Sequence, residues 1–165
     1  MPSKLGRAGR LRPAAVRRGK NDLLFVYGTL RPFMHGAMAR RLRAAGEHLG
    51  AGAVRGRLYD LGPYPGLVDP RAPREWVIGD LYRLATPAAT LRLLDRYEGA
   101  HARARTPKFM RVERIVRLSG RNVAAWIYLY RRSVAKLVRI RGGDYLCYVT
   151  LGGLQIEFRG ANLET

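Results

Sequence analysis

The apolar residues of this chain come in short runs separated by glycine and proline, which limits the chain to a fold built largely from short strands. The longest run, residues 123–130, has the length of a strand and falls far short of the ~20 apolar residues that a membrane-spanning helix needs. We therefore expect no membrane partner. Apolar runs bounded by turn-forming residues predict strands at 23–26, 53–61, 76–84, 111–118 and 123–130. Alternation in the last run places three aromatic side chains on one face: Trp126, Tyr128 and Tyr130.

Two segments have helical periodicity instead. Residues 34–45 carry apolar side chains at helical spacing and are followed by a glycine, which predicts a helix. Thr86 and Pro87 form a good helix opening and Gly99 a matching stop, which predicts a second helix over about 87–98. Strands mixed with two helices predict an α+β domain, either a curved mixed sheet or a small mixed β-barrel with flanking helices.

The length of 165 residues and the hydrophobic content of 47% suit a single domain with one packed core. Residues 1–20 carry seven basic side chains, no acidic one and no apolar stretch, so we expect a disordered basic arm and no signal peptide. We expect the domain to span residues 21–150. Residues 151–165 are expected to form a C-terminal tail, either as one more strand or as a free end.

The formal net charge of +19 favours attraction to polyanions such as nucleic acids. The arm contributes +7 and the remainder +12, much of it from arginines spread along the expected helices and strands. Two interpretations stay open: a solvated basic surface, or a polyanion site to which the arm would contribute weak binding.

Cysteine and histidine usage points to no special chemistry. Cys147 is the only cysteine, so no internal disulfide can form, which is consistent with a reducing, cytoplasmic compartment. We expect Cys147 to be buried and inert between its apolar neighbours. His35, His48 and His101 lack the mutual spacing of metal ligands, and we expect no metal site.

Glu98 is the residue whose spacing suggests catalysis. It lies seven residues after Leu91 and four after Leu94, so all three project from the side of the helix that faces the core. Burial and the negative end of the helix dipole both raise the pKa of a carboxyl group in this position, towards the range of a general acid-base. The alternative is a solvent-facing glutamate neutralised by neighbouring arginines. Asp95 is expected at the surface.

The segment after the first strand, residues 27–31, forms a turn between a strand and a helix. Such a turn can offer successive backbone N–H groups to a carboxylate or phosphate. The simpler alternative is a glycine-containing strand exit in which Thr29 satisfies local backbone groups. The sequence contains neither a phosphate-binding loop motif nor a nucleophile turn motif.

Five short motifs occur in order along the chain: Tyr27-Gly28-Thr29-Leu30-Arg31, Gly56-x-Leu58-Tyr59-x-Leu61-Gly62-x-Tyr64-Pro65-Gly66-Leu67, Gly79-x-Leu81-Tyr82, Leu94-Asp95-x-Tyr97-Glu98-Gly99 and Ala125-Trp126-x-Tyr128. Together they resemble the gamma-glutamylcyclotransferase-like superfamily, in particular its gamma-glutamylamine cyclotransferase or avirulence-induced-gene-like branch. The resemblance covers about residues 22–145. Each motif alone is common, whereas five in order are specific.

The resemblance implies a small mixed β-barrel with flanking helices, no cofactor and a cavity for a gamma-glutamyl substrate. In such enzymes the substrate's α-amino nitrogen attacks its own γ-carbonyl, giving 5-oxoproline and a free amine or peptide. Glu98 would transfer the protons, and the implied substrate-binding residues are Tyr27, Gly28, Thr29, Leu30, Tyr128 and Arg111. The hydroxyl group of Tyr128 would orient the substrate or a developing oxyanion.

Two departures from the family pattern stand out. Arg111 matches the basic residue of a family Tyr-x-Arg element, but phenylalanine stands at position 109, so the usual tyrosine hydroxyl is missing. Tyr145 stands where many relatives have tryptophan, which implies a changed wall of the cavity.

Two functional hypotheses follow from the sequence. The first is a gamma-glutamyl (amine) cyclotransferase in which Glu98 is the acid-base, although the leaving amine or peptide is not indicated. The alternative is a non-catalytic basic binding module on the same fold. In it, the arm and the face formed by Trp126, Tyr128 and Tyr130 would hold single-stranded nucleic acid or another polyanion.

Overall fold

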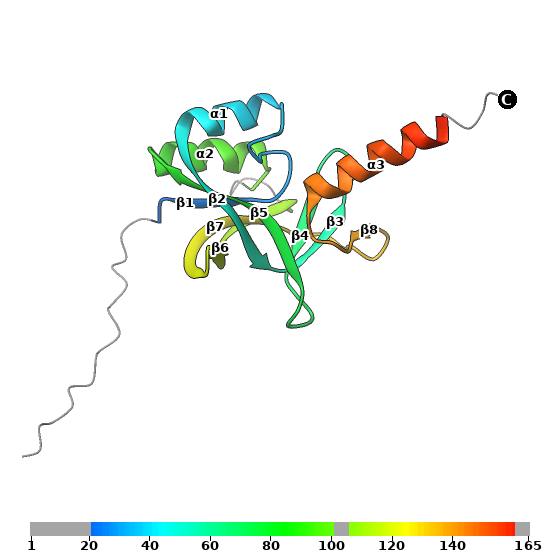
Figure 1. Ribbon diagram of the computed structural model, residues 1–165. Coiled ribbons are helices and arrows are strands. Elements are labelled where there is room, and N and C mark those ends of the chain that lie inside the picture. Colours follow the sequence, from blue (N-terminus) through cyan, green and yellow to red (C-terminus); the bar gives the residue numbers. More distant parts are fainter. Residues whose placement is uncertain (1–20, 101–105, 161–165) are drawn as a thin grey trace, which may run out of the picture.

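The computed structural model describes residues 21–100 and 106–160, with side chains described up to residue 152 (Figure 1). The predicted arm, His101 and the last five residues lie outside the described residues. The elements in chain order are β1 (Leu23–Val26), α1 (Ala37–Ala45), β2 (Gly46–Arg55), β3 (Arg57–Asp60), β4 (Pro65–Val68), β5 (Trp76–Leu84), α2 (Pro87–Tyr97), β6 (Phe109–Leu118), β7 (Arg121–Tyr130), β8 (Val138–Ile140) and α3 (Tyr145–Gly160).

Five of the strands close into a barrel in the order β1-β5-β2-β6-β7. Neighbours pair antiparallel except β1 and β7, which are parallel and close the barrel. A second sheet of order β4-β3-β8 lies beside it, and α1 and α2 lie next to each other over one side of the barrel (Figure 1). The predicted α+β fold, a small mixed β-barrel with flanking helices, is confirmed.

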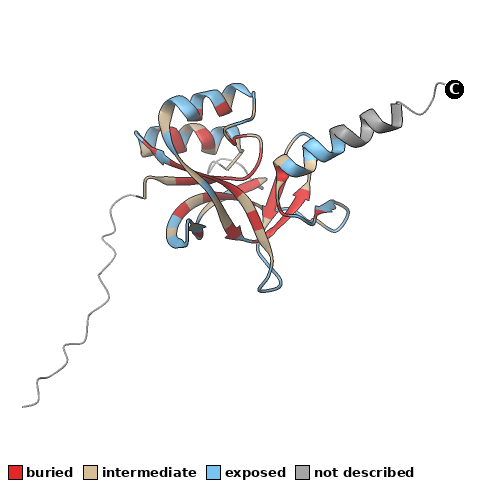
Figure 2. Ribbon diagram, viewed as in Figure 1, coloured by how far each residue is buried: buried red, intermediate tan, exposed pale blue. Residues whose placement is uncertain are grey.

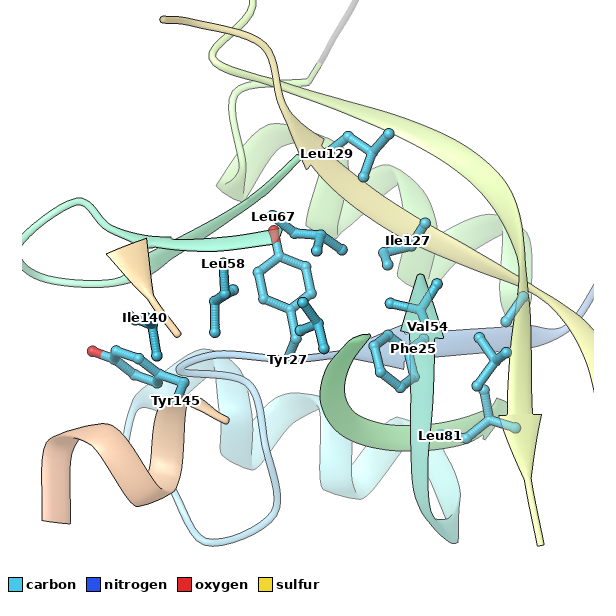
Figure 3. Close-up of a cluster of buried hydrophobic side chains, with 13 residues drawn as sticks. Phe25, Tyr27, Val54, Leu58, Leu67, Leu81, Ile127, Leu129, Ile140 and Tyr145 are labelled. Carbon is cyan, nitrogen blue, oxygen red and sulfur yellow. The ribbon is translucent and has the colours of Figure 1, made fainter. Parts of the chain in front are cut away.

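Alternation along the barrel strands produces two apolar cores. On β1, Phe25 faces the barrel interior, whose cluster includes Tyr27, Leu58, Leu67 and Ile127 (Figure 3). The other face of β1 packs against the helices. Burial is accordingly concentrated on the barrel strands and on the helix faces turned towards them (Figure 2). A strand with both faces covered reads as an unbroken apolar run, which explains the sequence of residues 23–26.

The predicted aromatic face of β7 is present, but its surroundings contradict the use proposed for it. Tyr128 is buried in the cluster between barrel and helices, and Trp126 and Tyr130 pack against that cluster. A face covered in this way cannot stack nucleic-acid bases. The binding-module hypothesis is therefore wrong in this part, because the three aromatic side chains help to hold α1 and α2 on the barrel.

The region predicted as one strand over 53–61 is divided at Gly56 between two sheets. Residues 46–55 form β2 and pair with β5, whereas residues 57–60 form β3 and pair with β4 and β8. At the point where the chain passes from one sheet to the other, the Gly56 N–H donates to the carbonyl oxygen of Glu75 at 3.1 Å. A glycine inside an apolar run is a signal for such a break.

Three elements escaped prediction altogether. Strands β4 and β8 are short, four and three residues, and their sequences carry little periodicity. Helix α3 spans Tyr145–Gly160, and it includes residues 151–160, for which a strand or a free end was expected. Cys147 lies in this helix and is exposed, so the prediction of a buried cysteine is wrong.

A buried ion pair fixes the turn after β1 against the barrel. Arg31 Nε lies 2.6 Å from Oδ2 of Asp80 on β5, and the two side chains are 6% and 3% exposed. Arg31 Nη1 reaches Oδ1 of Asp144, just before α3, at 2.7 Å. His48 Nε2 lies 2.8 Å from Oδ1 of Asp80. The network therefore connects the turn with β2, β5 and the start of α3.

Replacing Asp80 with alanine should lower the free energy of unfolding by about 3 kcal/mol, because it leaves the buried guanidinium of Arg31 without its nearest counter-charge. We expect the lower end of the usual range because Asp144 stays in place. The matched control is Asp22→Ala, which removes an exposed carboxylate 3.9 Å from Arg83 and should cost less than about 1 kcal/mol. Urea unfolding of both variants measures the difference, and equal losses would contradict the account.

Candidate active site

Helix α2 ends in a Schellman motif that determines where Glu98 lies. Gly99 takes a positive φ of 66°, its N–H donates to Arg96 O at 3.3 Å, and the Ala100 N–H donates to Asp95 O at 2.8 Å. Glu98 occupies the C-cap position in helical conformation. Leu91 and Leu94, on the same side of the helix, are buried against the barrel. The predicted inward direction of Glu98 therefore agrees with the packing of α2.

A cavity of about 210 Å³ opens between the end of α2, the turn after β1 and the loop before β4. It brings together most of the residues singled out from the sequence: Glu98, Tyr27, Gly28, Thr29, Leu30 and Tyr128 all line it. The rest of the lining had no role predicted from the sequence and consists of Phe25, Val26, Tyr64, Pro65, Tyr97 and Phe109. Among these lining residues Glu98 is the sole ionisable group that titrates near neutral pH.

Burial raises the pKa of the Glu98 carboxyl group from its ordinary value to about 7. The cause is the partial removal of water from around the carboxylate, because the apolar groups of the cavity do not stabilise the charged form as water does. A group with this pKa exchanges its proton with little free-energy cost near neutral pH. The site thus contains a carboxyl group suited to general acid-base chemistry.

The turn opposite Glu98 offers backbone donors. The carbonyl oxygen of Gly28 accepts the Arg31 N–H at 3.1 Å, which closes the turn. Within the described part of the chain, no protein acceptor is paired with the N–H groups of Gly28, Thr29 or Leu30. A Cβ at position 28 would lie 2.7 Å from the ring of Pro65, so only glycine allows this close approach. Successive free amides of this kind suit a bound carboxylate.

Two tyrosines line the cavity with different hydroxyl partners. The Tyr27 hydroxyl donates to the carbonyl oxygen of Tyr128 at 2.6 Å, so this group holds β1 to β7 and is already occupied. The Tyr128 hydroxyl donates to Oδ1 of Asp95 at 2.8 Å. Burial, first of all, raises the pKa of both phenols. At Tyr128 the hydrogen bond to Asp95 raises it further, and the Glu98 carboxylate adds to the effect at both residues. Both tyrosines therefore stay protonated.

Asp95 and Arg111 lie behind Tyr128. Arg111 Nη1 is 3.4 Å from Oδ2 of Asp95, and its guanidinium stacks 5.0 Å from the ring of Trp126. Arg111 does not line the cavity, so the expected direct contact with substrate is not supported by its position. Asp95 is 20% exposed, and the expectation of a surface aspartate was wrong because its carboxylate joins Tyr128 to Arg111.

The expected change of the cavity wall at Tyr145 is also contradicted. Tyr145 is 5% exposed and belongs to the core cluster with Leu58 and Ile140 (Figure 3), and it is not among the residues that line the cavity. In contrast, Lys108 was missed. Its Nζ donates to the Tyr64 hydroxyl and lies 4.7 Å from the centre of that ring, so it holds a wall of the cavity in place. Tyr64, the partner of Lys108, lies within the second sequence motif, and this motif was the sequence feature that could have pointed to this wall of the cavity.

Among the described residues, no three His, Cys, Asp or Glu side chains come together as metal ligands would. The described helices also include none with the length and apolar character needed to cross a membrane.

The family follows from comparison with known proteins. Residues 24–147 match the model of the family described as gamma-glutamyl cyclotransferase, AIG2-like, and the chain belongs to this family. No curated protein matches the chain.

Solved structures share the fold. The protein ytfP from Escherichia coli is 30% identical over 77% of this chain and 98% of its own, with a TM-score of 0.53. An AIG2-like protein from Mus musculus is 22% identical over 75% and 87%, with a TM-score of 0.57. YkqA from Bacillus subtilis is 21% identical with a TM-score of 0.62, and the match covers 81% of this chain but 42% of YkqA.

The raised pKa of Glu98 predicts that the folded protein loses stability as pH rises from about 4.5 to about 7. In this window the unfolded chain has released the proton while the folded protein retains it, so folding becomes less favourable. Glu98→Gln removes the titration. This variant should match the wild type near pH 4 and exceed its free energy of unfolding by up to about 3 kcal/mol at pH 8.

Urea unfolding of both proteins at several pH values measures this difference. Glu47→Gln, which changes an exposed glutamate on β2, is the matched control for the substitution itself. A difference between Glu98→Gln and wild type that stays constant from pH 4 to pH 8 would contradict the raised pKa.

Proposed function

We propose that the protein is a gamma-glutamyl cyclotransferase acting on a gamma-glutamyl amine or peptide. The observation that carries the proposal is the shared cavity, which places the Glu98 carboxyl group and the free amides of the Gly28 turn around one hollow. Membership of the gamma-glutamyl cyclotransferase, AIG2-like family supports the same reaction class.

Binding positions the reacting atoms. The N–H groups of Gly28, Thr29 and Leu30 take the α-carboxylate of the glutamyl group, a charge-assisted contact that needs no basic side chain. The aromatic wall of Tyr64, Tyr97 and Phe109 surrounds the rest of the ligand. Holding both ends keeps the α-amino nitrogen close to the γ-carbonyl carbon, which replaces a loose encounter with an oriented one.

Glu98 transfers the protons. As a carboxylate it takes a proton from the substrate's α-ammonium group, and the freed nitrogen forms a bond to the γ-carbonyl carbon. The bond between that carbon and the leaving nitrogen then breaks as Glu98 returns the proton to this nitrogen. The α-nitrogen gives up two protons in all, and the released amine carries them away as its ammonium form. The other product is 5-oxoproline.

Of the two roles that the resemblance implied for Tyr128, its hydrogen bond favours orienting the substrate over stabilising an oxyanion. Because its hydroxyl proton points to Asp95, the lone pairs of its oxygen remain for the cavity. The oxygen therefore accepts a hydrogen bond from the substrate's ammonium or amino group and does not donate to an oxyanion. Asp95 and Arg111 act as positioning residues for this hydroxyl.

The test is release of 5-oxoproline from a panel of gamma-glutamyl amines and dipeptides. Glu98→Gln should lower kcat about 10²- to 10⁴-fold, because the proton carrier is lost while the binding turn remains. Glu47→Gln should leave the rate unchanged, since that side chain is exposed on β2. Unaltered turnover in folded Glu98→Gln would overturn the assignment.

The pH dependence of kcat/KM gives a second test. Activity requires the carboxylate form of Glu98, so the rate should rise with pH and level off above the pKa of about 7. A profile measured from pH 5 to pH 9 that shows no acid limb near pH 7 would contradict Glu98 as the base.

A further inference from the structure

A second hollow, on a different part of the molecule, is lined by arginines. It lies between β3, β8 and the start of β5, and it shares no lining residue with the cavity at Glu98. Its lining contains a single acidic side chain, Glu75, and four basic ones: Arg57, Arg74, Arg139 and Arg141. Gly142, which is exposed, also lines the hollow. We call this hollow the arginine groove.

The carboxylate in the groove is already occupied by protein partners. Glu75 Oε2 accepts the backbone N–H groups of Arg71 and Ala72 at 2.5 and 3.0 Å, and Oε1 accepts Arg139 Nη2 at 2.7 Å. These bonds, the Arg71 N–H first, lower the pKa of Glu75, so it stays charged and fixes its loop. One negative charge therefore faces four positive ones, and the groove keeps a net positive charge.

Part of this charge is built into the scaffold. Arg57 is 9% exposed, with Nη1 donating to the Tyr59 hydroxyl at 2.9 Å and Nε to the Asp69 carbonyl oxygen at 3.2 Å. A buried arginine held by neutral acceptors and a carboxylate 3.8 Å away presents its remaining N–H groups in a fixed direction. Arg74 and Arg141 at the rim are exposed and free to adapt.

The positive surface continues from the groove across the barrel. Trp76, which lines the groove, lies between two exposed arginines: the guanidinium of Arg55 is 4.6 Å from its ring centre, and that of Arg117 is 5.0 Å away. Arg55 pairs with Trp76 across β2 and β5, and β6 brings Arg117 alongside β2. Neighbouring strands lie about 4.8 Å apart, so the basic surface extends roughly 10 Å beyond the groove.

The shape of this surface selects its ligand. A lone phosphate would occupy the groove and leave Arg55 and Arg117 unused, whereas a chain of phosphates follows both parts. Cation–π contacts already engage the ring of Trp76 with two guanidinium groups, so the surface offers no free aromatic platform for a base. Contacts to the phosphate backbone, which do not depend on sequence, remain.

We propose that the arginine groove, together with Arg55 and Arg117, binds the phosphate backbone of a nucleic acid strand. The groove holds one phosphate on Arg57 and Arg139, and the rim arginines hold its neighbours. Binding is independent of Glu98 and of turnover, because the two hollows lie on different elements.

The experiment uses the full chain and a fluorescein-labelled 20-nucleotide oligo-dT, with anisotropy measured between 50 and 300 mM NaCl. The first variant changes the exposed Arg55, Arg74, Arg117 and Arg141 to serine. The matched control removes the same charge from exposed arginines of α1 and α2, by changing Arg40, Arg41, Arg92 and Arg96 to serine. Both variants keep residues 1–20, so any contribution of this segment is common to them.

The groove variant should bind at least about tenfold more weakly at 50 mM NaCl. Its slope of log K against log salt should be shallower by about 3, since each phosphate contact to a single strand contributes about 0.7. The control should lose less than about threefold. Far-ultraviolet circular dichroism verifies folding, and if the fourfold variant is unfolded, Arg74→Ser with Arg141→Ser should still reduce the slope by about 1.4.

Three results would overturn the proposal. Equal losses in the groove variant and the control, or no binding by the wild type at 50 mM NaCl, would show that the charge acts only as a diffuse surface. Inorganic tripolyphosphate and unlabelled oligo-dT are also compared as competitors at equal concentrations of phosphate groups. If tripolyphosphate competes at least as well, the groove binds a small phosphate-bearing ligand.

Discussion

The buried ion pair between Arg31 and Asp80 is the interaction on which the arrangement of the site depends. It anchors the turn after β1 to β5, and the same guanidinium group also contacts Asp144 just before α3. The same turn also packs against Pro65, so closely that only glycine fits at position 28. A turn held from both sides keeps its amides in fixed positions, which pre-organised binding of a carboxylate requires.

The second half of the site depends on apolar packing. Leu91 and Leu94 attach α2 to the outer face of β1, and the Schellman motif stops the helix at Glu98, beside the cavity. Residues some seventy positions apart in the sequence are thus brought together by one cluster between barrel and helices. The same packing excludes water from the carboxylate, so the interaction that positions Glu98 also raises its pKa.

Local patterns were sufficient for much of this. Helical spacing predicted α2 and the inward direction of Glu98, and turn residues predicted the exit of β1. Contacts between distant segments were not predictable: the break at Gly56 depends on pairing with Glu75, and the role of Asp95 depends on Tyr128. The position of Asp80 could have predicted the buried ion pair. An acidic residue inside an apolar strand requires a buried partner.

The arrangement requires that Glu98 is a half-buried carboxyl group with a pKa near neutrality, in the same cavity as the turn at Gly28. The most direct measurement is a carbon-13 NMR titration of the glutamate side-chain carboxyl groups, with Glu98→Gln used to assign the resonance. We predict that this resonance titrates with a pKa of about 7. A midpoint near 4.5, the ordinary value for glutamate, would contradict it.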